Sequence, residues 1–474
     1  MSPRRTKIIA TIGPACATVA TLQPLITAGV DLVRINFSHG KTQQQIKLIN
    51  TARIAAQRSN KEIGIIADLQ GPKIRIGCFK NAWVELKKQQ LFTLDCSSNA
   101  PGNEDFVSVD YKNLYLDVEV GCTLLLDDGL LELQVEKIQQ KKIICRVMTN
   151  GRLSDNKGIN KKGGGLTAAT LTDKDMGDLH HAIKAGADYI AVSFTRNADD
   201  ISRTKQKILE AGGKAGVIAK IERAEALNEI DAIIEAADAV MVARGDLGVE
   251  IGLANVPFQQ KRIIERSRAL DKAVITATQM MESMITQPQA TRAEVSDVAN
   301  AVLDGTDAVM FSAETAVGQY PLKVIQTVVD VCVSAETNPS AQRSNHRLEC
   351  QFKLTDEAIA MAVMYIANHY PIRAIISLTE SGATPLWMSR IRSNIPVYAL
   401  TRHLSTMRKI MLYRGVYPIA FDAMKVNSNE LREQAIATVK AQSLVANQDI
   451  VILTYGSLLG YEGGTDSIKV CNVN

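Results

Sequence analysis

Eight short apolar segments, rich in valine, isoleucine and alanine, recur along the chain, and each ends in polar or glycine residues. Residues with helical spacing fill most of the intervals, as at 201–211, 224–236, 257–270 and 291–303. Apolar strands that alternate with helices are typical of a parallel sheet covered on both faces. Eight such units predict a (β/α)8 barrel, with the active site at the C-terminal ends of its strands. These strands are predicted at 7–13, 32–40, 63–71, 189–195, 216–223, 239–248, 273–280 and 308–315.

Two further regions depart from this repeat. Residues 72–168 alternate apolar with polar side chains, which predicts a small all-β domain, a β-barrel lid inserted after the third strand. It returns through Gly163, Gly164 and Gly165, a hinge suited to closure over a substrate. A second α/β pattern begins near residue 342, with strands predicted at 374–379, 396–400, 417–422, 450–455 and 467–473. We therefore predict a catalytic barrel at 1–71 and 169–341, a lid at 72–168 and a C-terminal α/β domain at 342–474.

Charge and cysteine usage limit the possible partners and location. The 54 basic and 50 acidic residues are spread along the chain without long runs, so nucleic acid is not an expected partner. The eight cysteines form no C-x-x-C pair, which favours free thiols in a reducing compartment. No stretch of 18 apolar residues occurs, so we expect a cytoplasmic protein with no membrane segment.

Charged side chains stand at the ends of the fifth and sixth predicted strands. Lys220 and Glu222 share one strand face, and Arg244 and Asp246 follow on the next strand. Two carboxylates about 4 Å apart repel by roughly 4 kcal/mol at an effective dielectric near 20. A divalent cation removes that repulsion, and two carboxylates with water and substrate oxygens suit magnesium. The alternative is a structural cluster in which the four charges neutralise one another.

Other strand ends carry polar groups that are weaker signals alone. Arg34, Asn36 and Ser38 share one face of the second strand, and Thr278 and Ser312 lie near the ends of the seventh and eighth. By themselves these are typical of ordinary polar strand ends.

Six segments together resemble the motif set of the pyruvate kinase family: 34–40, 68–75, 220–222, 243–248, 277–284 and 312–315. The resemblance covers nearly the whole chain, in the order of that family. It implies transfer of the phosphoryl group of phosphoenolpyruvate to ADP, giving pyruvate and ATP in the final step of glycolysis. It also implies a Mg²⁺ or Mn²⁺ requirement and a homotetramer.

The resemblance assigns roles to individual residues. Glu222 and Asp246 would hold the metal ion, Lys220 would stabilise the transferring phosphoryl group, and Arg34 would bind the substrate phosphate. The substrate carboxylate would be bound by the N–H groups of Gly245 and Asp246 and the Thr278 hydroxyl. Proton delivery to the enolate would involve Thr278, Ser312 and Glu314, and the nucleotide would contact Asn36, Phe37, Ser38, His39, Arg75 and Lys157.

One departure from the family concerns potassium. Many members bind this ion through oxygens that match Asn36, Ser38, Asp68 and the carbonyl of Leu69, and they carry a glutamate where this chain has Lys73. A lysine brings a positive charge to that region. We therefore expect activity without K⁺.

The loop after the first C-terminal strand resembles the effector loop of the family: Thr379, Glu380, Ser381, Gly382, Ala383 and Thr384. A helix start at this point suits a phosphate group. Members that bind fructose 1,6-bisphosphate carry a lysine in place of Glu380. The carboxylate predicts a monophosphate activator instead, such as AMP or ribose 5-phosphate, and the alternative is a tight turn without a ligand.

Two other functions fit parts of the sequence. A magnesium-dependent enolate lyase or aldolase of the phosphoenolpyruvate and pyruvate barrel superfold would also pair a glutamate with an aspartate, but it would not need the lid. A non-catalytic metabolite sensor would keep the fold and use only the C-terminal loop.

Overall fold

A closed barrel of eight parallel strands forms the centre of the protein, for which a computed structural model describes residues 3–342 and 350–474. The predicted barrel is confirmed. Each strand ends earlier than predicted, because the chain turns into loops or short helices at the barrel mouth. The strands are β1 (Lys7–Thr11), β2 (Leu32–Asn36), β3 (Gly64–Asp68), β12 (Tyr189–Val192), β13 (Gly216–Ile221), β14 (Ala239–Ala243), β15 (Ala273–Ala277) and β16 (Ala308–Phe311).

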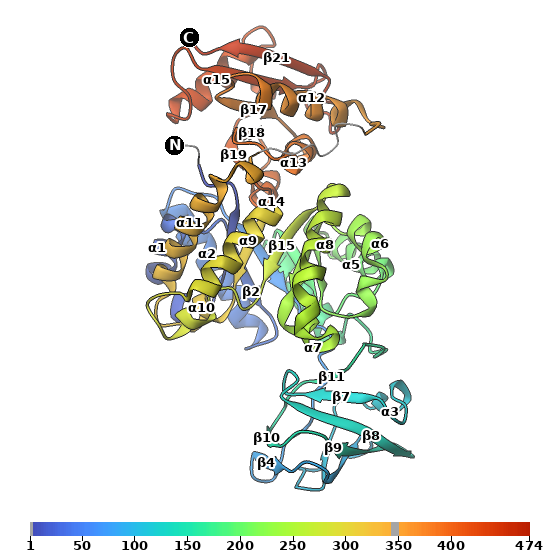
Figure 1. Cartoon of the computed structure of the whole chain (residues 1–474). Coiled ribbons are helices and arrows are strands. Elements are labelled where there is room, and N and C mark those ends of the chain that lie inside the picture. Colours follow the sequence, from blue (N-terminus) through green and yellow to red (C-terminus); the bar gives the residue numbers. More distant parts are fainter. Residues whose placement is uncertain (1–2, 343–349) are drawn as a thin grey trace.

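Helices cover the outside of the barrel and bury the outer face of its strands (Figure 1). The predicted helix at 224–236 is interrupted near residue 228, so that only its second part is α-helical. The predicted ends of the sixth and eighth strands form the short helices α7 (Arg244–Ile251) and α10 (Ala313–Ala316), because periodicity alone does not distinguish short apolar segments. The other barrel helices are α1 (Val19–Ala28), α2 (Thr42–Arg58), α4 (Asp173–Lys184), α5 (Ala198–Glu210), α6 (Ile230–Ala236), α8 (Val256–Ala269), α9 (Arg292–Asp304) and α11 (Pro321–Glu336).

Four aspartates close the base of the barrel, one before every second strand. Each carboxylate accepts the backbone N–H of a residue on the neighbouring strand, at 2.7–2.9 Å. In three of the four cases, the turn that precedes the aspartate contains a glycine with a positive φ. Glycine is favoured at such positions just after a helix, because it adopts the left-handed conformation without strain. The aspartates are Asp31, Asp188, Asp238 and Asp307, and their N–H partners are Ile8, Ile65, Val217 and Val274.

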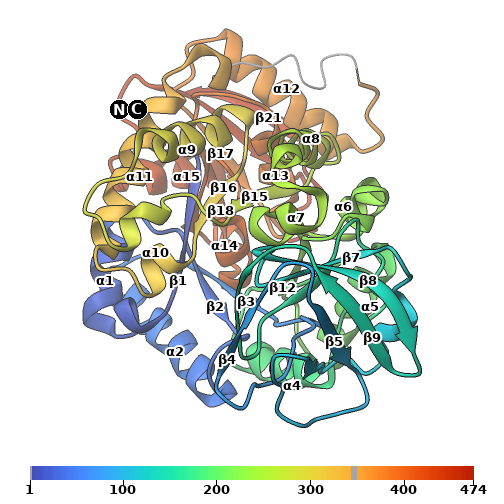
Figure 2. The same cartoon turned by 60° about the horizontal axis from the view of Figure 1, so that its bottom comes forward.

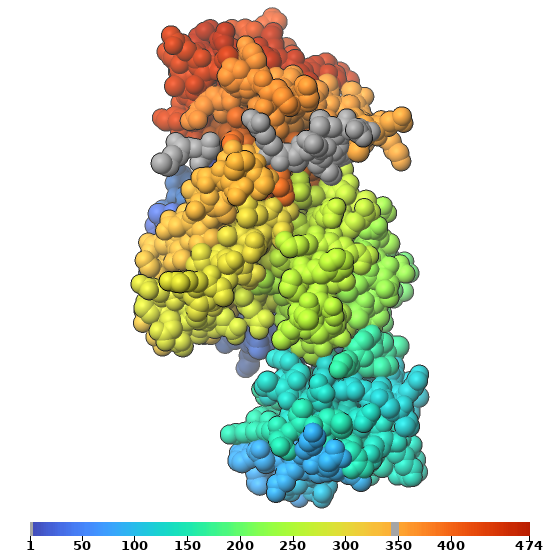
Figure 3. Space-filling model, viewed as in Figure 1, coloured from blue at the N-terminus to red at the C-terminus, as the bar shows by residue number. Residues whose placement is uncertain are grey.

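The lid domain is all-β, as predicted, and has its own apolar core. A six-stranded sheet in the order β11-β7-β8-β9-β5-β6 lies beside the pair β10-β4. Figure 3 shows the lid as a distinct mass attached to one side of the barrel. Its elements are β4 (Trp83–Leu86), β5 (Leu91–Asp95), β6 (Phe106–Ser108), α3 (Leu114–Asp117), β7 (Thr123–Leu126), β8 (Leu131–Gln139), β9 (Lys142–Val147), β10 (Gly151–Ser154) and β11 (Ile159–Lys161).

The return from the lid to the barrel passes through three glycines with φ of 83°, 82° and 91°. Side chains rarely adopt such values, so glycine is required here. The N–H of Gly163 donates to the carbonyl of Glu250, and that of Gly165 donates to the Glu225 carboxylate, at 2.7 Å. Both barrel partners follow strands of the candidate site, so the root of the lid is tied to the barrel mouth.

The C-terminal domain lies at the opposite end of the barrel from the lid (Figures 1 and 2). All five predicted strands are present, in the order β19-β18-β17-β20-β21, with β21 antiparallel. No helix in the described ranges is long and apolar enough to cross a membrane. The elements are α12 (Thr355–His369), β17 (Ala374–Leu378), α13 (Ala383–Arg390), β18 (Val397–Thr401), α14 (Leu404–Ile410), β19 (Val416–Ala420), α15 (Leu431–Ala441), β20 (Ile450–Tyr455) and β21 (Ser467–Asn472).

Candidate active site

Lys220 is the centre of a buried polar network at the C-terminal end of β13. Its Nζ lies 2.8 Å from Oε1 of Glu222, 3.3 Å from Oδ1 of Asp68 and 2.7 Å from Oγ of Ser193. Burial alone would lower the pKa of Lys220, but Asp68 and Glu222 raise it above its usual value. The side chain is therefore a fixed ammonium group.

Asp68 joins this network to β2. Its Oδ2 accepts the Nε–H of Arg34 at 2.6 Å, and Arg34 also donates to the Thr11 hydroxyl at 3.2 Å. Burial would raise the pKa of Asp68, yet Lys220 and Arg34 together lower it below its usual value. One carboxylate thus holds two cations at the barrel mouth, where both can face a substrate anion.

Glu222 and Asp246 are the predicted metal ligands. Oε2 of Glu222 accepts the N–H of Phe194 at 2.8 Å, and Phe194 has a φ of 57°. Burial raises the pKa of Glu222, Lys220 opposes this shift, and the charge of Asp246 raises it further. The charge of Asp246 thus disfavours the ionised form of Glu222, which is the condition that a bound cation relieves.

The donor set fits magnesium or manganese with only two protein carboxylates. Within residues 3–342 and 350–474, no group of three or more His, Cys, Asp or Glu side chains is arranged to hold a metal. Substrate and water oxygens would have to fill the remaining positions, as is common for Mg²⁺.

Arg244 does not join the charged cluster. Its guanidinium contacts Asp297 at 2.8 Å and the carbonyls of Thr278 and Gln279 at 2.6 and 3.1 Å. The four-charge ion-pair cluster that the sequence left open is therefore wrong. Lys220 faces Glu222, while Asp246 contacts Lys73 instead.

The predicted carboxylate pocket lies between the ends of β14 and β15. The Thr278 hydroxyl accepts the N–H of Gly245 at 2.9 Å. Thr278 and Gln279 have φ of 69° and 51°, in the left-handed region that such residues rarely adopt. Arg244 holds both of their carbonyls, so the arginine fixes a strained turn that presents the threonine to the barrel mouth.

Glu314, predicted to take part in proton delivery through water, is held by two backbone N–H groups. Its two oxygens accept the backbone N–H groups of Ser312, at 2.7 Å, and Met281, at 3.3 Å. The buried carboxylate thus joins the loops after β15 and β16. Among the described residues, the Thr278 side chain has no direct hydrogen bond to Ser312 or Glu314 and instead contacts the Gly245 N–H and the Ala277 carbonyl.

The residues predicted to contact nucleotide fall into two groups on different domains. Asn36 accepts the N–H of Ser38 at 3.0 Å, and the carbonyl of Phe37, the residue before Ser38 and His39, accepts a bond from Lys174 at 2.8 Å. In the lid, the guanidinium of Arg75 donates to the Asn156 carbonyl at 2.8 Å, and Lys157 pairs with Asp127 at 2.7 Å. The described contacts do not bring these two groups together.

Sequence reasoning missed Ser193, which follows β12. Its hydroxyl lies 2.7 Å from Nζ of Lys220 and donates to the carbonyl of Leu69 at 2.8 Å. Ser193 is 3% exposed. The one available signal was a polar residue at a predicted strand end, which is too common to single out a site.

Lys73 reaches the metal side of the site. Its Nζ lies 3.1 Å from Oδ1 of Asp246 and 3.7 Å from Oδ1 of Asp128 in the lid. Burial would lower the pKa of Lys73, but Asp246 and Asp128 raise it. Lys73 is thus a charged link between barrel and lid.

Fold and site together define a class. This is a (β/α)8-barrel enzyme whose mouth holds a buried ammonium between two carboxylates, one of which also binds a guanidinium, an arrangement suited to stabilising negative charge on a metal-bound substrate.

Comparisons with known proteins agree on the family. A family model described as the pyruvate kinase barrel domain matches residues 3–325, and one for the pyruvate kinase alpha/beta domain matches 357–471. The chain belongs to the pyruvate kinase family and is a phosphotransferase, which excludes the lyase and sensor alternatives.

Full-length relatives support this assignment. The chain is 48% identical to a pyruvate kinase of Buchnera aphidicola from Schizaphis graminum, over 99% of this chain and 98% of the relative. It is 47% identical to pyruvate kinase II of Salmonella typhimurium, over 99% of both. A crystal structure of a pyruvate kinase from Cryptosporidium parvum superimposes with a TM-score of 0.93 at 34% identity, over 99% of this chain and 96% of that one.

Proposed function

We propose that the network around Lys220 transfers the phosphoryl group of phosphoenolpyruvate to ADP, giving pyruvate and ATP. The observation that carries this proposal is the 2.8 Å contact between Lys220 and Glu222, with the charge of Asp246 acting on the same glutamate. One ammonium and two carboxylates beside each other suit a phosphoryl group that arrives bound to a divalent metal.

Two cations act on the phosphoryl group in this proposal. Asp68 fixes Arg34 so that its free N–H groups hold the substrate phosphate, and it fixes Lys220 beside the path of transfer. Charge spreads over the phosphoryl oxygens during transfer, so a preorganised ammonium stabilises the transition state more than the ground state. Glu222 and Asp246 would hold Mg²⁺ or Mn²⁺, which neutralises charge on the substrate and phosphate oxygens.

Thr278 would bind the substrate carboxylate with the N–H groups of Gly245 and Asp246. The Gly245 N–H already donates to Thr278, and a carboxylate oxygen would replace that contact. Loss of the phosphoryl group leaves an enolate that must gain a proton. We assign the delivery of that proton to Thr278, with Ser312 and Glu314 reached through water.

ADP would bind between the Asn36–His39 segment and the lid residues Arg75 and Lys157. Because these groups lie apart, lid closure must bring them together, with the glycine turn at Gly163–Gly165 as the hinge. The closed lid would also exclude water from the transferring phosphoryl group.

We further propose that K⁺ is not required. Asp68 is held by Arg34 and Lys220, the Leu69 carbonyl accepts a bond from Ser193, and the Asn36 side chain accepts the N–H of Ser38. Three of the four oxygens that would bind the ion therefore already have partners. Turnover in K⁺ and Na⁺ at matched ionic strength should agree within about twofold, and a large activation by K⁺ would defeat this proposal.

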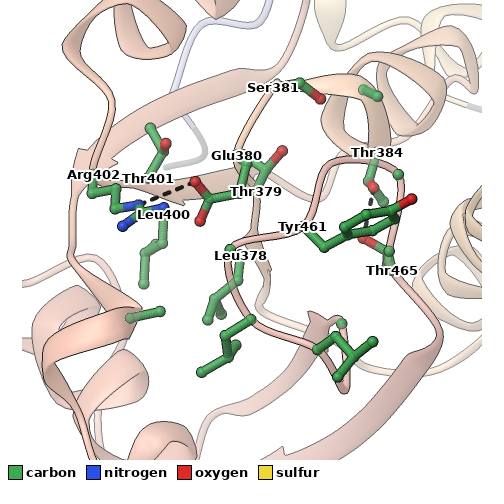
Figure 4. Close-up of a pocket in the computed structure, with 18 of the residues that line it drawn as sticks. Leu378, Thr379, Glu380, Ser381, Thr384, Leu400, Thr401, Arg402, Tyr461 and Thr465 are labelled. Carbon is green, nitrogen blue, oxygen red and sulfur yellow. Dashed lines mark hydrogen bonds and ion pairs between the residues drawn. The ribbon is translucent and has the colours of Figure 1, made fainter.

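The proposed effector site is a hollow beside β17 and the start of α13, which Figure 4 shows. Glu380 faces Arg402 at 3.1 Å and His403 at 2.5 Å, and the Glu380 carbonyl accepts a bond from Thr406. Thr379, Ser381, Ala383 and Thr384 line the same hollow. Gly382 has a φ of 89° and precedes the helix, whose first N–H groups suit one phosphate.

Glu380 limits the charge that this hollow can accept. A bisphosphate would bring a second phosphate near the carboxylate, whereas a monophosphate such as AMP or ribose 5-phosphate can bind the helix start and Arg402. Activation by each compound at subsaturating phosphoenolpyruvate tests this proposal, and fructose 1,6-bisphosphate is the comparison. Stronger activation by the bisphosphate would contradict it.

A coupled assay tests the main proposal. Purified protein with phosphoenolpyruvate and ADP should form pyruvate and ATP in equal amounts with Mg²⁺ or Mn²⁺, and excess EDTA should stop turnover. Pyruvate without ATP would contradict phosphoryl transfer to ADP. We also propose a cytoplasmic homotetramer, with the domain boundaries given above, and ultracentrifugation would report the assembly.

A further inference from the structure

We propose that the joint between the barrel and the C-terminal domain binds one small monovalent inorganic anion of the size and charge of chloride. A narrow hollow lies at this joint, beside Gly305 and the end of α13. It contains none of the residues assigned to phosphoryl transfer. Its lining includes five arginines: Arg5, Arg268, Arg390, Arg392 and Arg414.

Carboxylates balance only part of this charge. Asp307 pairs with Arg390, at 2.8 Å between Oδ2 and Nη1, and both side chains are 1% exposed. Glu336 lies 3.6 Å from the Nε of Arg5. Among the residues that the structure describes, five guanidinium groups and two carboxylates leave three positive charges in a region with little solvent.

One more carboxylate lies nearby without changing this balance. Asp304 acts on the charge of Arg392, but it forms an ion pair with Lys261. The aspartate and the lysine therefore cancel each other, and the excess of three positive charges remains.

Helix ends explain some of the arginines but not all of their charge. Arg392 and Arg414 donate to the carbonyls of Leu303 and Val302 at the end of α9, and Arg5 donates to the carbonyl of Glu336 at the end of α11. Arg268 lies in the last turn of α8. Each helix C-terminus carries about −0.5 charge, so three such ends offset roughly 1.5 charges. The remainder, about +1.5, lies midway between the charge of a monovalent anion and that of a phosphate dianion, so the size of the hollow decides between them.

Two donors at this joint lack partners among the described residues. They are the Nη2 of Arg414 and the Nε of Arg392, both buried. Arg414 is 9% exposed. Burial lowers the pKa of Arg414 to about 10, and burial with the neighbouring arginines lowers the pKa of Arg268 to about 10. A buried donor without an acceptor is costly, and an anion would supply the acceptor.

The size of the hollow restricts the ligand. The volume of the hollow is about 20 Å³, and a single water needs about 10–15 Å³. A sugar phosphate or a nucleotide is far too large. Chloride is little larger than water and accepts several N–H groups at once.

A crystal of the full-length protein grown in sodium bromide tests the site directly, because bromide scatters anomalously and resembles chloride. We expect one anomalous peak within hydrogen-bonding reach of Arg414. A structure that shows water in the hollow, or bromide peaks at other places only, would overturn the proposal.

Thermal unfolding tests the site in solution. At constant ionic strength, replacing gluconate by chloride should raise the midpoint of wild-type unfolding by about 2 °C or more, since a ligand of the folded state stabilises it. R268M should lose this shift and be at least as stable as wild type in gluconate, because it removes a repelled charge. R266M is the matched control, since Arg266 lies on the same helix in an exposed pair with Asp231.

The two variants separate the possible results. A retained shift in R268M, or an equal loss in R266M, would contradict a site at the joint. If R268M does not fold, the bromide structure of the wild-type protein still decides the question.

Discussion

The two ends of the barrel both bury charged residues, but they treat them differently. At the base, each aspartate accepts a backbone N–H and faces a cation, as Asp307 does with Val274 and Arg390. At the mouth, Glu222 pairs with Lys220, but burial and the charge of Asp246 raise its pKa. The base aspartates thus have paired charges, as structural carboxylates do, whereas the glutamate at the mouth is influenced by a second carboxylate whose charge a bound ligand can balance.

Replacing Lys220 by methionine should have the largest effect. The methionine side chain is about as long as that of lysine but has no ammonium group in the path of transfer. We therefore expect kcat to fall at least about 10³-fold. The fold should survive, because Arg34 still balances Asp68 and Glu222, whose pKa burial already raises, can bind a proton in place of its lost partner. Coupled assays give kcat, and circular dichroism reports the fold. A kcat within tenfold of wild type would show that Lys220 does not stabilise the transferring group.

Arg390→Met tests whether the buried charges at the base of the barrel contribute to stability rather than to catalysis. It leaves Asp307 buried without its cation, and breaking a buried pair in this manner costs about 3–5 kcal/mol of stability. Urea unfolding should show this loss, while the folded fraction keeps its KM for ADP. A variant as stable as wild type but with a lower kcat would show that the charges at the base also act in catalysis, contrary to the proposed difference between the two ends of the barrel.

Because Glu250, at the root of the lid, is buried, we expect the stability of the fold to depend on pH. Burial raises its pKa to about 7, opposed by the Ala224 N–H that it accepts at 2.9 Å. The folded pKa lies above the unfolded value near 4.5, so folding binds a proton between these pH values. The stabilising contribution is complete below about pH 4.5 and is lost as pH rises through 7.

Glu250→Gln should therefore flatten the stability curve between about pH 4.5 and 7. The amide still accepts the Ala224 N–H, and at pH 8 the variant should be more stable than wild type by about 1–3 kcal/mol. Denaturant titrations across this range measure the effect. Glu85→Gln, at an exposed lid position, is the control. An unchanged slope in Glu250→Gln would contradict a buried, proton-binding carboxylate.

The sequence predicted the barrel well because its strands are buried on both faces and read as continuous apolar segments. It also placed Lys220 and Glu222 side by side, since alternation along a strand determines which side chains share a face. Helix α7 was predicted as part of a strand, because an apolar period over a few residues fits both structures. The contacts of Arg244, Lys73 and Ser193 were not predictable, since they depend on side-chain directions between segments far apart in sequence.

Replacing Ser193 should have the smallest effect on kcat among these variants, and it tests whether a neutral group at the barrel mouth helps to position Lys220. Its hydroxyl is a neutral acceptor for Lys220, unlike the two carboxylates, and it links that ammonium to the Leu69 carbonyl. Losing a hydrogen bond to a charged group costs about 1.5–3 kcal/mol. If half of that cost or more falls on the transition state, Ser193→Ala should lower kcat about tenfold. KM for ADP and the thermal midpoint should change little. Ser193→Thr keeps the hydroxyl and should recover most of the activity, and Ser202→Ala, on the outer surface of α5, is the control. Equal stability losses in the alanine and threonine variants, without a kcat difference between them, would show that Ser193 only packs beside the site and does not position Lys220.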